Sequence, residues 1–209
     1  MKKLLVFGDS WPAGAELSNP SADAFPIILA KKLNLICENR SKSATSIDHA
    51  VLEFLKSDLT NAVVLFCVTG YSRSMYFDRG TVWEVHPSNA ELEWYYTKMY
   101  SDELGQLNRL KNCLLIQEIC INRGIPVYFV SNWDTVPTHT LLDSKLWAQQ
   151  TLIQTICKKP YKVTGSTVDW LSIDRSDRIN MTNNHPNAAG HHLIAEELYK
   201  WINSVSTTN

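Results

Sequence analysis

Short apolar runs alternate with segments of helical period along most of this chain. The runs are four to six residues long and rich in valine, leucine and phenylalanine, which is typical of buried strands. Strands are predicted at residues 4–7, 35–38, 63–68, 127–130 and 168–171, and helices at residues 23–33, 46–58, 103–122, 141–157 and 187–202. This alternation predicts an α/β fold with a mostly parallel sheet that is covered by helices on both faces.

One segment, residues 72–102, does not follow the alternation. It has no clean period and is too long for an ordinary connection between a strand and a helix. Its aromatic side chains are Tyr76, Phe77, Trp83, Trp94, Tyr95, Tyr96 and Tyr100. Two interpretations stay open: an additional packed hairpin or helix, or a lid or substrate wall over a site.

Length and charge narrow the class of protein further. The 209 residues are expected to form a single domain, residues 1–209, with the aromatic segment as an insertion. The net charge of −1 argues against nucleic acid or an anionic membrane as a partner, so we expect a small molecule. No run resembles a signal peptide or a membrane span, so a cytoplasmic protein is expected. The oligomeric state is not predicted.

The first predicted strand runs into Gly8-Asp9-Ser10, at the edge where parallel sheets bind ligands. Neither G-x-G-x-x-G nor the P-loop pattern is present there, so we expect no nucleotide cofactor. A serine at such a turn is either a helix cap or a nucleophile held above the sheet. Without a candidate base, Ser10 is better interpreted as a helix cap than as a nucleophile.

A serine nucleophile needs a base, and His185 is the best candidate among the six histidines. It lies in "NNHPNAAGHHLIAEEL", at the mouth of the last predicted helix, where Pro186 stiffens the loop. His49, His191 and His192 fall within predicted helices and are interpreted as surface or interhelix residues. Without an accompanying cluster of acids or cysteines, a metal site is not expected.

With Ser10 and His185 in place, the sequence resembles the SGNH hydrolases, also called GDSL esterases and lipases. "VFGDSWPAG" is similar to the first block of the family and "HPNAAGHHLIAEEL" to the last, so the resemblance spans Phe7 to Leu198. It implies a three-layer, flavodoxin-like α/β/α fold with about five central strands. It also implies an acyl-enzyme mechanism with Ser10 as nucleophile and His185 as base.

The middle blocks depart from the family. "NRSKSATS" keeps Asn39, but Ala44 stands where the family has the glycine whose N–H helps to form the oxyanion hole. The family's Gly-x-Asn-Asp falls on Thr69-Gly70-Tyr71-Ser72, so the oxyanion asparagine is missing. The resemblance therefore implies an oxyanion hole formed by Ser10 and Ala44, with Tyr71 as a substitute donor and Thr69 and Ser72 as alternatives to it.

Three further residues are predicted to bind substrate: Asp9, Trp11 and Arg73. Arg73 is a candidate to hold an anionic group. It also completes "TGYSR", which is similar to the Thr-x-x-x-Arg form seen in diverged bacterial and phage relatives.

The acid of the triad is the third departure. The family places aspartate three residues before the histidine, and Thr182 occupies that position here. Thr182 and Asp177 are the predicted orienting residues, with Asp174 and Asn183 as further possibilities and a plain Ser10–His185 dyad as the alternative.

Two functions of different class follow. The first is a serine esterase that cleaves an acyl or acetyl ester, with a small-molecule or carbohydrate substrate. The second is an inactive or weakly active protein of the same fold that binds a carbohydrate or acylated ligand, as the missing acid and asparagine suggest. A nucleotide-binding flavodoxin-like domain is disfavoured because no phosphate loop is present.

Overall fold

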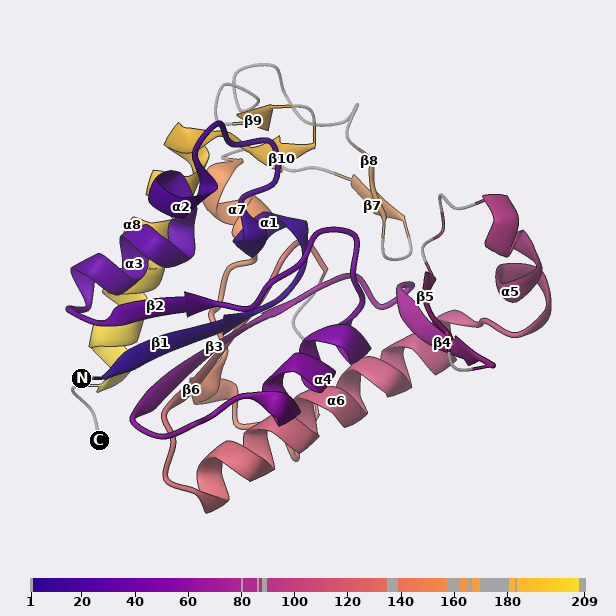
Figure 1. Ribbon diagram of the computed structural model, residues 1–209, viewed down its shortest axis with the longest axis horizontal. Helices are drawn as coiled ribbons and strands as arrows, with labels where there is room; N and C mark the ends of the chain where they lie inside the picture. The colour runs from indigo at the N-terminus through magenta and orange to yellow at the C-terminus, as the bar shows by residue number, and fades with distance from the viewer. Residues whose placement is uncertain are drawn as a thin grey trace.

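A computed structural model describes residues 2–79, 81–85, 87, 90–134, 139–157, 162–164, 167–169, 181–182 and 184–206. A central sheet lies between two layers of helices (Figure 1). The strands are β1 (Lys3–Phe7), β2 (Ile36–Asn39), β3 (Ala62–Val68), β4 (Ser74–Asp78), β5 (Thr81–Val85), β6 (Val127–Ser131), β7 (Lys162–Thr164), β8 (Thr167–Asp169), β9 (Met181–Thr182) and β10 (His185–Pro186). The α-helices are α1 (Ser10–Ala13), α2 (Pro20–Asp23), α3 (Phe25–Lys32), α4 (Ile47–Lys56), α5 (Glu93–Lys98), α6 (Asp102–Asn122), α7 (Leu152–Ile156) and α8 (Ala188–Ser206), with short 3₁₀ turns η1 (Ala90–Leu92) and η2 (Ser144–Leu146).

The central sheet has the order β2-β1-β3-β6, and all of its pairings are parallel. β1 lies between β2 and β3, with Leu5 opposite Glu38 on one side and Val64 on the other. The strand order changes direction at β1, which is the point where such sheets bind ligands. The predicted three-layer α/β/α fold is therefore confirmed, with four described strands in the central sheet.

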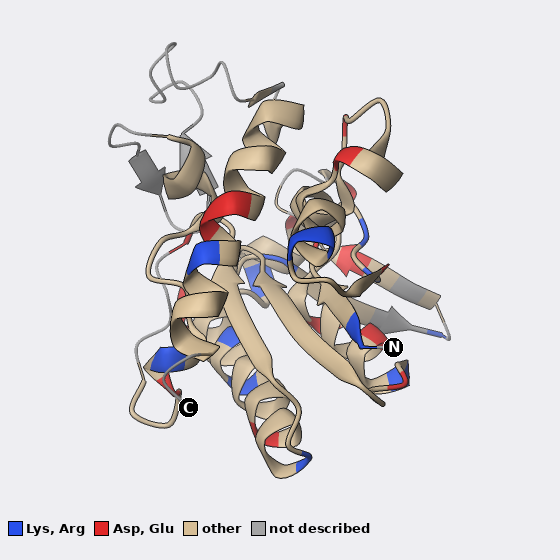
Figure 2. Ribbon diagram, turned by 90° about the vertical axis from the view of Figure 1, so that its left-hand side faces the viewer, with Lys and Arg blue, Asp and Glu red and all other residues tan. Residues whose placement is uncertain are grey.

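Alternate residues of each strand enter different halves of the core, because side chains in a strand point to opposite faces. Leu4 and Val6 of β1 pack under α3, α7 and α8, whereas Leu5 and Phe7 pack under α4 and α6. Both faces of the sheet are thus buried, which explains why the strands are nearly continuous apolar runs. Figure 2 shows acidic and basic residues interspersed over the helices.

One predicted helix was wrong, and one predicted strand is present but lies outside the central sheet. Residues 141–157 do not form one helix: after η2, Trp147 makes a parallel bridge to Phe129 at the edge of β6, and only α7 is helical. Trp147 also stacks on Phe129 with ring centroids 4.8 Å apart, so tertiary contacts override the helical period. The strand predicted at residues 168–171 is instead β8, paired antiparallel with β7 outside the central sheet, and residues 170 and 171 lie outside the described part.

The aromatic segment 72–102 forms the antiparallel hairpin β4–β5, then η1 and α5. Its aromatic rings pack mainly on one another, as in the edge-on pair of Tyr76 and Trp94. The segment lies beyond the carboxyl ends of the central strands (Figure 1). No helix in the described residues is both long and apolar enough to cross a membrane.

Candidate active site

The turn between β1 and α1 carries Ser10 at the carboxyl edge of the sheet. Gly8 is needed there because a Cβ would lie 2.7 Å from Pro12 Cγ and 2.8 Å from Cys67 Cβ. The chain then turns sharply at Asp9, which caps α1 by accepting a hydrogen bond from the Trp11 N–H at 3.1 Å. Ser10 is the first residue of this helix, so the capping role belongs to Asp9 and not to the serine.

Asp9 is fully buried, and its carboxylate is surrounded by donors. Oδ1 accepts from Trp11 N–H and from the Asn132 side chain at 2.8 Å, and Oδ2 accepts from the Thr69 hydroxyl at 2.6 Å and from Arg73 Nη1 at 2.9 Å. A buried carboxylate is tolerated when its lone pairs are used in this way. The ends of β1, β3 and β6 are thereby tied together directly under Ser10.

The predicted substrate contacts of this turn have other partners in the structure. The side chains of Asp9 and Trp11 are buried, and Trp11 packs on Trp133 with ring centroids 5.9 Å apart. The Arg73 guanidinium is paired with Asp9 and lies 5.4 Å from the centre of the Trp133 ring. These contacts stabilise the turn, and substrate contact by Asp9, Trp11 or Arg73 remains a prediction.

The loop after β2 approaches the same turn from the other side. Asn39 Nδ2 donates to the carbonyl of Pro12 at 2.7 Å, and the Lys42 N–H donates to the carbonyl of Gly8 at 3.1 Å. Ala44 is exposed and has a φ of 60°, a left-handed conformation that usually favours glycine. The loop therefore has a backbone suited to glycine, although alanine occupies the position.

Tyr71, the predicted substitute oxyanion donor, is placed on a second buried carboxylate. Its N–H donates to Asp134 Oδ2 at 3.3 Å, and the Arg109 Nη1 also contacts that oxygen at 3.3 Å. Burial raises the pKa of Asp134 to about 6, because desolvation outweighs the favourable charge of Arg109. An oxyanion contact by Tyr71 remains a prediction, since its backbone donor is directed at Asp134.

His185 lies in β10, and α1 packs against this strand. The structure thus brings the helix that carries Ser10 against the strand that carries His185, although the two elements are far apart in the chain. His185 Nδ1 lies 3.3 Å from Oε1 of Glu16, and the side chains are 23% and 34% exposed, respectively. Glu16 was not a predicted site residue, because a single glutamate in a turn has no distinguishing sequence pattern.

The predicted orienting residues lie mostly outside the described part. Thr182 pairs with His185 in the β9–β10 ladder, and its side chain is not described. Asp174, Asp177 and Asn183 lie outside the described residues. Their role as orienting groups is still a prediction.

His191, one of the other histidines, has a structural role. His191 is fully buried between α8 and α3, where its Nδ1 accepts a hydrogen bond from the Phe25 N–H at 3.1 Å. Burial, followed by the nearby His185 and His192, lowers the pKa of His191 to about 4, so it is neutral at pH 7. The interhelix interpretation of His191 is confirmed.

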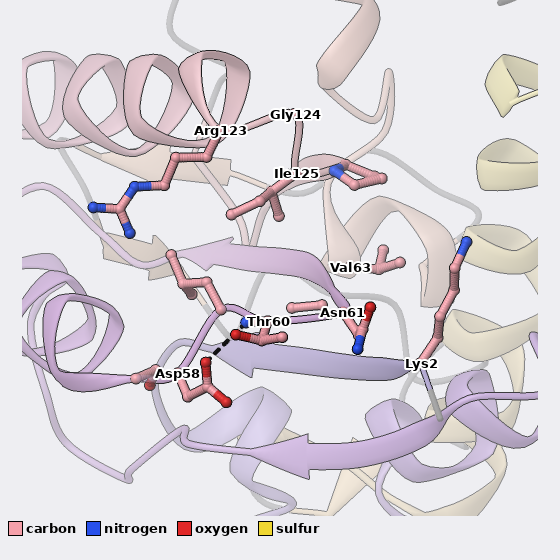
Figure 3. Close-up of a pocket in the computed structure, with 12 residues that line it drawn as sticks. Lys2, Asp58, Thr60, Asn61, Val63, Arg123, Gly124 and Ile125 are labelled. Carbon is pink, nitrogen blue, oxygen red and sulfur yellow. Dashed lines mark hydrogen bonds between the residues drawn. The ribbon is translucent and has the colours of Figure 1, made fainter.

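A hollow of about 610 Å³ lies at the opposite, amino-terminal edge of the sheet (Figure 3). Lys2, Asp58, Asn61 and Arg123 are among its lining residues. It contains none of the predicted catalytic residues. Among the described residues, no group of three or more histidine, cysteine or acidic side chains has the arrangement of a metal site.

The fold is that of known esterases. EstA, a psychrotrophic esterase from Pseudoalteromonas sp., matches over 100% of both chains with a TM-score of 0.54 and 14% identity. A putative lipolytic protein of the G-D-S-L family from Desulfitobacterium hafniense matches over 96% of this chain and 99% of its own, with a TM-score of 0.56 and 11% identity. TesA matches over 98% and 99%, with a TM-score of 0.55 and 13% identity.

These similarities confirm the predicted resemblance at the level of the fold: the chain has the three-layer fold of GDSL esterases and lipases. No protein-family model matches the sequence, and no curated protein matches it. The conclusion therefore rests on three-dimensional structure together with the two sequence blocks around Ser10 and His185.

Asn132 supports the Ser10 turn, although it was not among the predicted site residues. Asn132 directly follows the end of β6, and its side chain reaches Asp9 at 2.8 Å. A polar residue just after a buried strand was the available signal, because the carboxyl ends of parallel strands meet at one edge.

Proposed function

We propose that this protein is a serine esterase that cleaves an acyl or acetyl ester of a small molecule or carbohydrate through an acyl-enzyme. The observation that supports this most is the packing of α1, which carries Ser10, against β10, which carries His185. These two residues belong to the two sequence blocks that resemble GDSL esterases. The fold, which is that of known esterases, supports the same assignment.

In the proposed reaction, Ser10 Oγ attacks the acyl carbonyl carbon while His185 Nε2 accepts the hydroxyl proton. The negative oxygen that forms is stabilised by the backbone N–H groups of Ser10 and Ala44, with Tyr71 as a further predicted donor. The C–O bond of the ester then breaks, and the alcohol leaves with the proton from His185. Water, deprotonated by His185, then attacks the acyl carbon; the bond between this carbon and Ser10 Oγ breaks, the acid is released, and His185 returns the proton to Ser10 Oγ.

Asp9 contributes to this reaction through position. Its four hydrogen bonds hold the turn, so Ser10 does not have to be ordered when substrate binds. The residues under the turn are buried and paired with one another, which is the arrangement that a preorganised nucleophile needs. Thr182 or Asp177 is predicted to orient the imidazole.

The assay compares wild type with Ser10→Ala and His185→Ala on short-chain p-nitrophenyl esters. Each substitution is expected to lower kcat by ~10⁴–10⁶-fold, because nucleophile and base act as a unit. Ser204→Ala and His192→Ala are matched controls at exposed positions of α8 and should retain wild-type activity.

A serine-reactive phosphonate provides an independent readout. The EstA structure is of a monoethylphosphonate-inhibited form, so this class of probe suits the fold. Wild type should be labelled on Ser10 with the mass of one phosphonyl group, and Ser10→Ala should not be labelled. If wild type neither turns over esters above Ser10→Ala nor is labelled at Ser10, the esterase assignment is wrong.

The second candidate function is ligand binding without turnover. The exposed aromatic residues Trp83 and Trp94 of the segment 72–102 favour it, because such rings stack on sugars and acyl chains. Quenching of tryptophan fluorescence by oligosaccharides or acylated sugars, in a protein that fails both tests above, would support this function.

A further inference from the structure

We propose that Glu16 positions His185 for catalysis, in the place of the aspartate that the resemblance leads one to expect at position 182. The proposal rests on the esterase function proposed above. It assigns the third member of the triad to the loop after α1, on the same short segment that carries Ser10.

The contact between the two side chains is the first observation. His185 Nδ1 lies 3.3 Å from Glu16 Oε1, and Nδ1 is buried without a hydrogen bond of good geometry among the described residues. A carboxylate at this distance becomes an acceptor for the Nδ1–H after a small rotation of either side chain. Catalytic hydrogen bonds are commonly long in unliganded structures and shorten when substrate binds.

The backbone around Glu16 is the second observation. Gly14 ends α1 with a φ of 75°, and the Ala15 N–H donates to the carbonyl of Ser10 at 3.0 Å. Glu16 itself has a φ of 67°, a left-handed conformation that is unfavourable for glutamate. Non-glycine residues in such conformations are concentrated at functional sites, where the surrounding structure enforces them. The nucleophile and the proposed acid are thus fixed to each other by one turn of chain.

Among the described residues near His185, Thr182 and His191 cannot supply the negative charge that Glu16 carries. Thr182 pairs with His185 across the β9–β10 ladder, but threonine has no charge with which to stabilise an imidazolium. His191 is buried and neutral at pH 7, and its Nδ1 is occupied by the Phe25 N–H. Neither residue can replace a carboxylate beside Nδ1.

The role of Glu16 follows from the position of the proton. A carboxylate that accepts the Nδ1–H fixes the neutral imidazole in the tautomer whose Nε2 is free to accept the Ser10 proton. When Nε2 becomes protonated, the negative charge of Glu16 stabilises the imidazolium. Glu16 gains no proton and forms no bond to substrate, so it is a positioning residue.

The test measures steady-state kinetics on p-nitrophenyl acetate. Glu16→Gln removes the charge and retains the size, and it should lower kcat by about 10²- to 10⁴-fold, the upper figure being the loss seen when a triad acid is replaced by its amide, with KM within about threefold of wild type. Glu16→Asp retains the charge with shorter reach and should recover part of kcat. Glu197→Gln, which breaks an exposed ion pair with Lys200, is the matched control and should equal wild type.

A second variant separates positioning from folding. Glu16→Gly removes the carboxylate and relieves the left-handed φ, so its melting temperature should equal or exceed that of wild type while its kcat falls as in Glu16→Gln. A merely structural residue would not show raised stability together with lost turnover. This comparison decides the question even if Glu16→Gln folds poorly.

Three results would overturn the proposal. If wild type is active and both Glu16→Gln and Glu16→Gly retain kcat within about twofold, Glu16 has no positioning role and the esterase function stands. If Asp177→Asn loses kcat while the Glu16 variants do not, the acid is Asp177. If wild type shows neither turnover nor phosphonate labelling, the esterase function fails and the role of Glu16 fails with it.

Discussion

The two loops proposed to hold the oxyanion differ in how their backbones are held. The turn of Ser10 is built on a buried carboxylate, Asp9, whose oxygens all have donors within 3.1 Å. The loop of Ala44 is exposed and left-handed, and its contacts are peripheral. The Thr45 hydroxyl donates to the Lys42 carbonyl at 2.6 Å, while the Ser46 N–H donates to Glu84 at 3.0 Å.

The difference shows two ways of preorganising a backbone donor. Hydrogen bonds from Thr69, Arg73 and Asn132 hold the buried Asp9 carboxylate of the Ser10 turn. The Ala44 loop is joined to the aromatic insertion through Glu84 of β5, which accepts from the Ser46 N–H and also pairs with His49 at 2.9 Å. We infer that the segment 72–102 supports the second loop, in addition to any role as a lid.

Removal of the Asp9 carboxylate should have the largest effect on stability. Asp9→Ala leaves the Arg73 guanidinium and two buried polar side chains without an acceptor, which should cost about 3–5 kcal/mol of unfolding free energy. Urea denaturation measures the loss. Asp58→Ala, at an exposed position on the opposite edge of the sheet, should have a much smaller effect on stability because its ion pair with Lys3 is screened by water. Equal losses in the two variants would mean that the Ser10 turn is not specially held.

The pH dependence of stability tests how far water is excluded from the carboxyl group of Asp134. Burial raises the pKa of Asp134 to about 6, so between pH 4 and 6 the folded protein retains a proton that the unfolded chain has released. This group therefore lowers stability as the pH rises through that range, by up to about 3 kcal/mol. In Asp134→Asn the decrease should vanish, so the variant gains relative to wild type from pH 4 to pH 7.

Urea denaturation at pH 4, 5.5 and 7 measures this difference. The exposed Asp143→Asn serves as the control, and its stability should change with pH in parallel with wild type. If the stability of Asp134→Asn also changes with pH in parallel with that of wild type, the Asp134 carboxyl is solvated. In that case the pair of Asp134 and Arg109 does not rigidify this edge of the sheet.

The smallest effect is expected at Ala44. Ala44→Gly relieves a left-handed φ but adds freedom to the unfolded chain, so the net gain should be about 0.5 kcal/mol. Thermal denaturation is the measurement. Ala189→Gly, at an exposed position in α8, should instead lose about 0.5–1 kcal/mol. A loss at Ala44 as large as at Ala189 would show that the loop is not strained.

The parallel sheet and its flanking helices could be predicted because their signals are local. Residues 4–7 of β1 and Ala62–Val68 are apolar runs bounded by polar residues, and Asp102–Asn122 follows a helix-capping serine, Ser101. The region after β6 could not be predicted in the same way. There Trp147 leaves the helical period to stack on Phe129, a contact that no sequence window contains.

The sequence by itself determined the four strands of the central sheet and most of the helices that cover it, and it nominated Ser10 and His185 as candidate site residues, because turn residues and helix boundaries leave local patterns. Only the tertiary structure decided which groups surround them. It placed Arg73 and Asn132 on Asp9, gave Ala44 its left-handed backbone, and brought Glu16 to the imidazole of His185. The physical reason is range: a hydrogen bond or ion pair acts over about 3 Å in space, and residues at that distance can be separated by most of the chain.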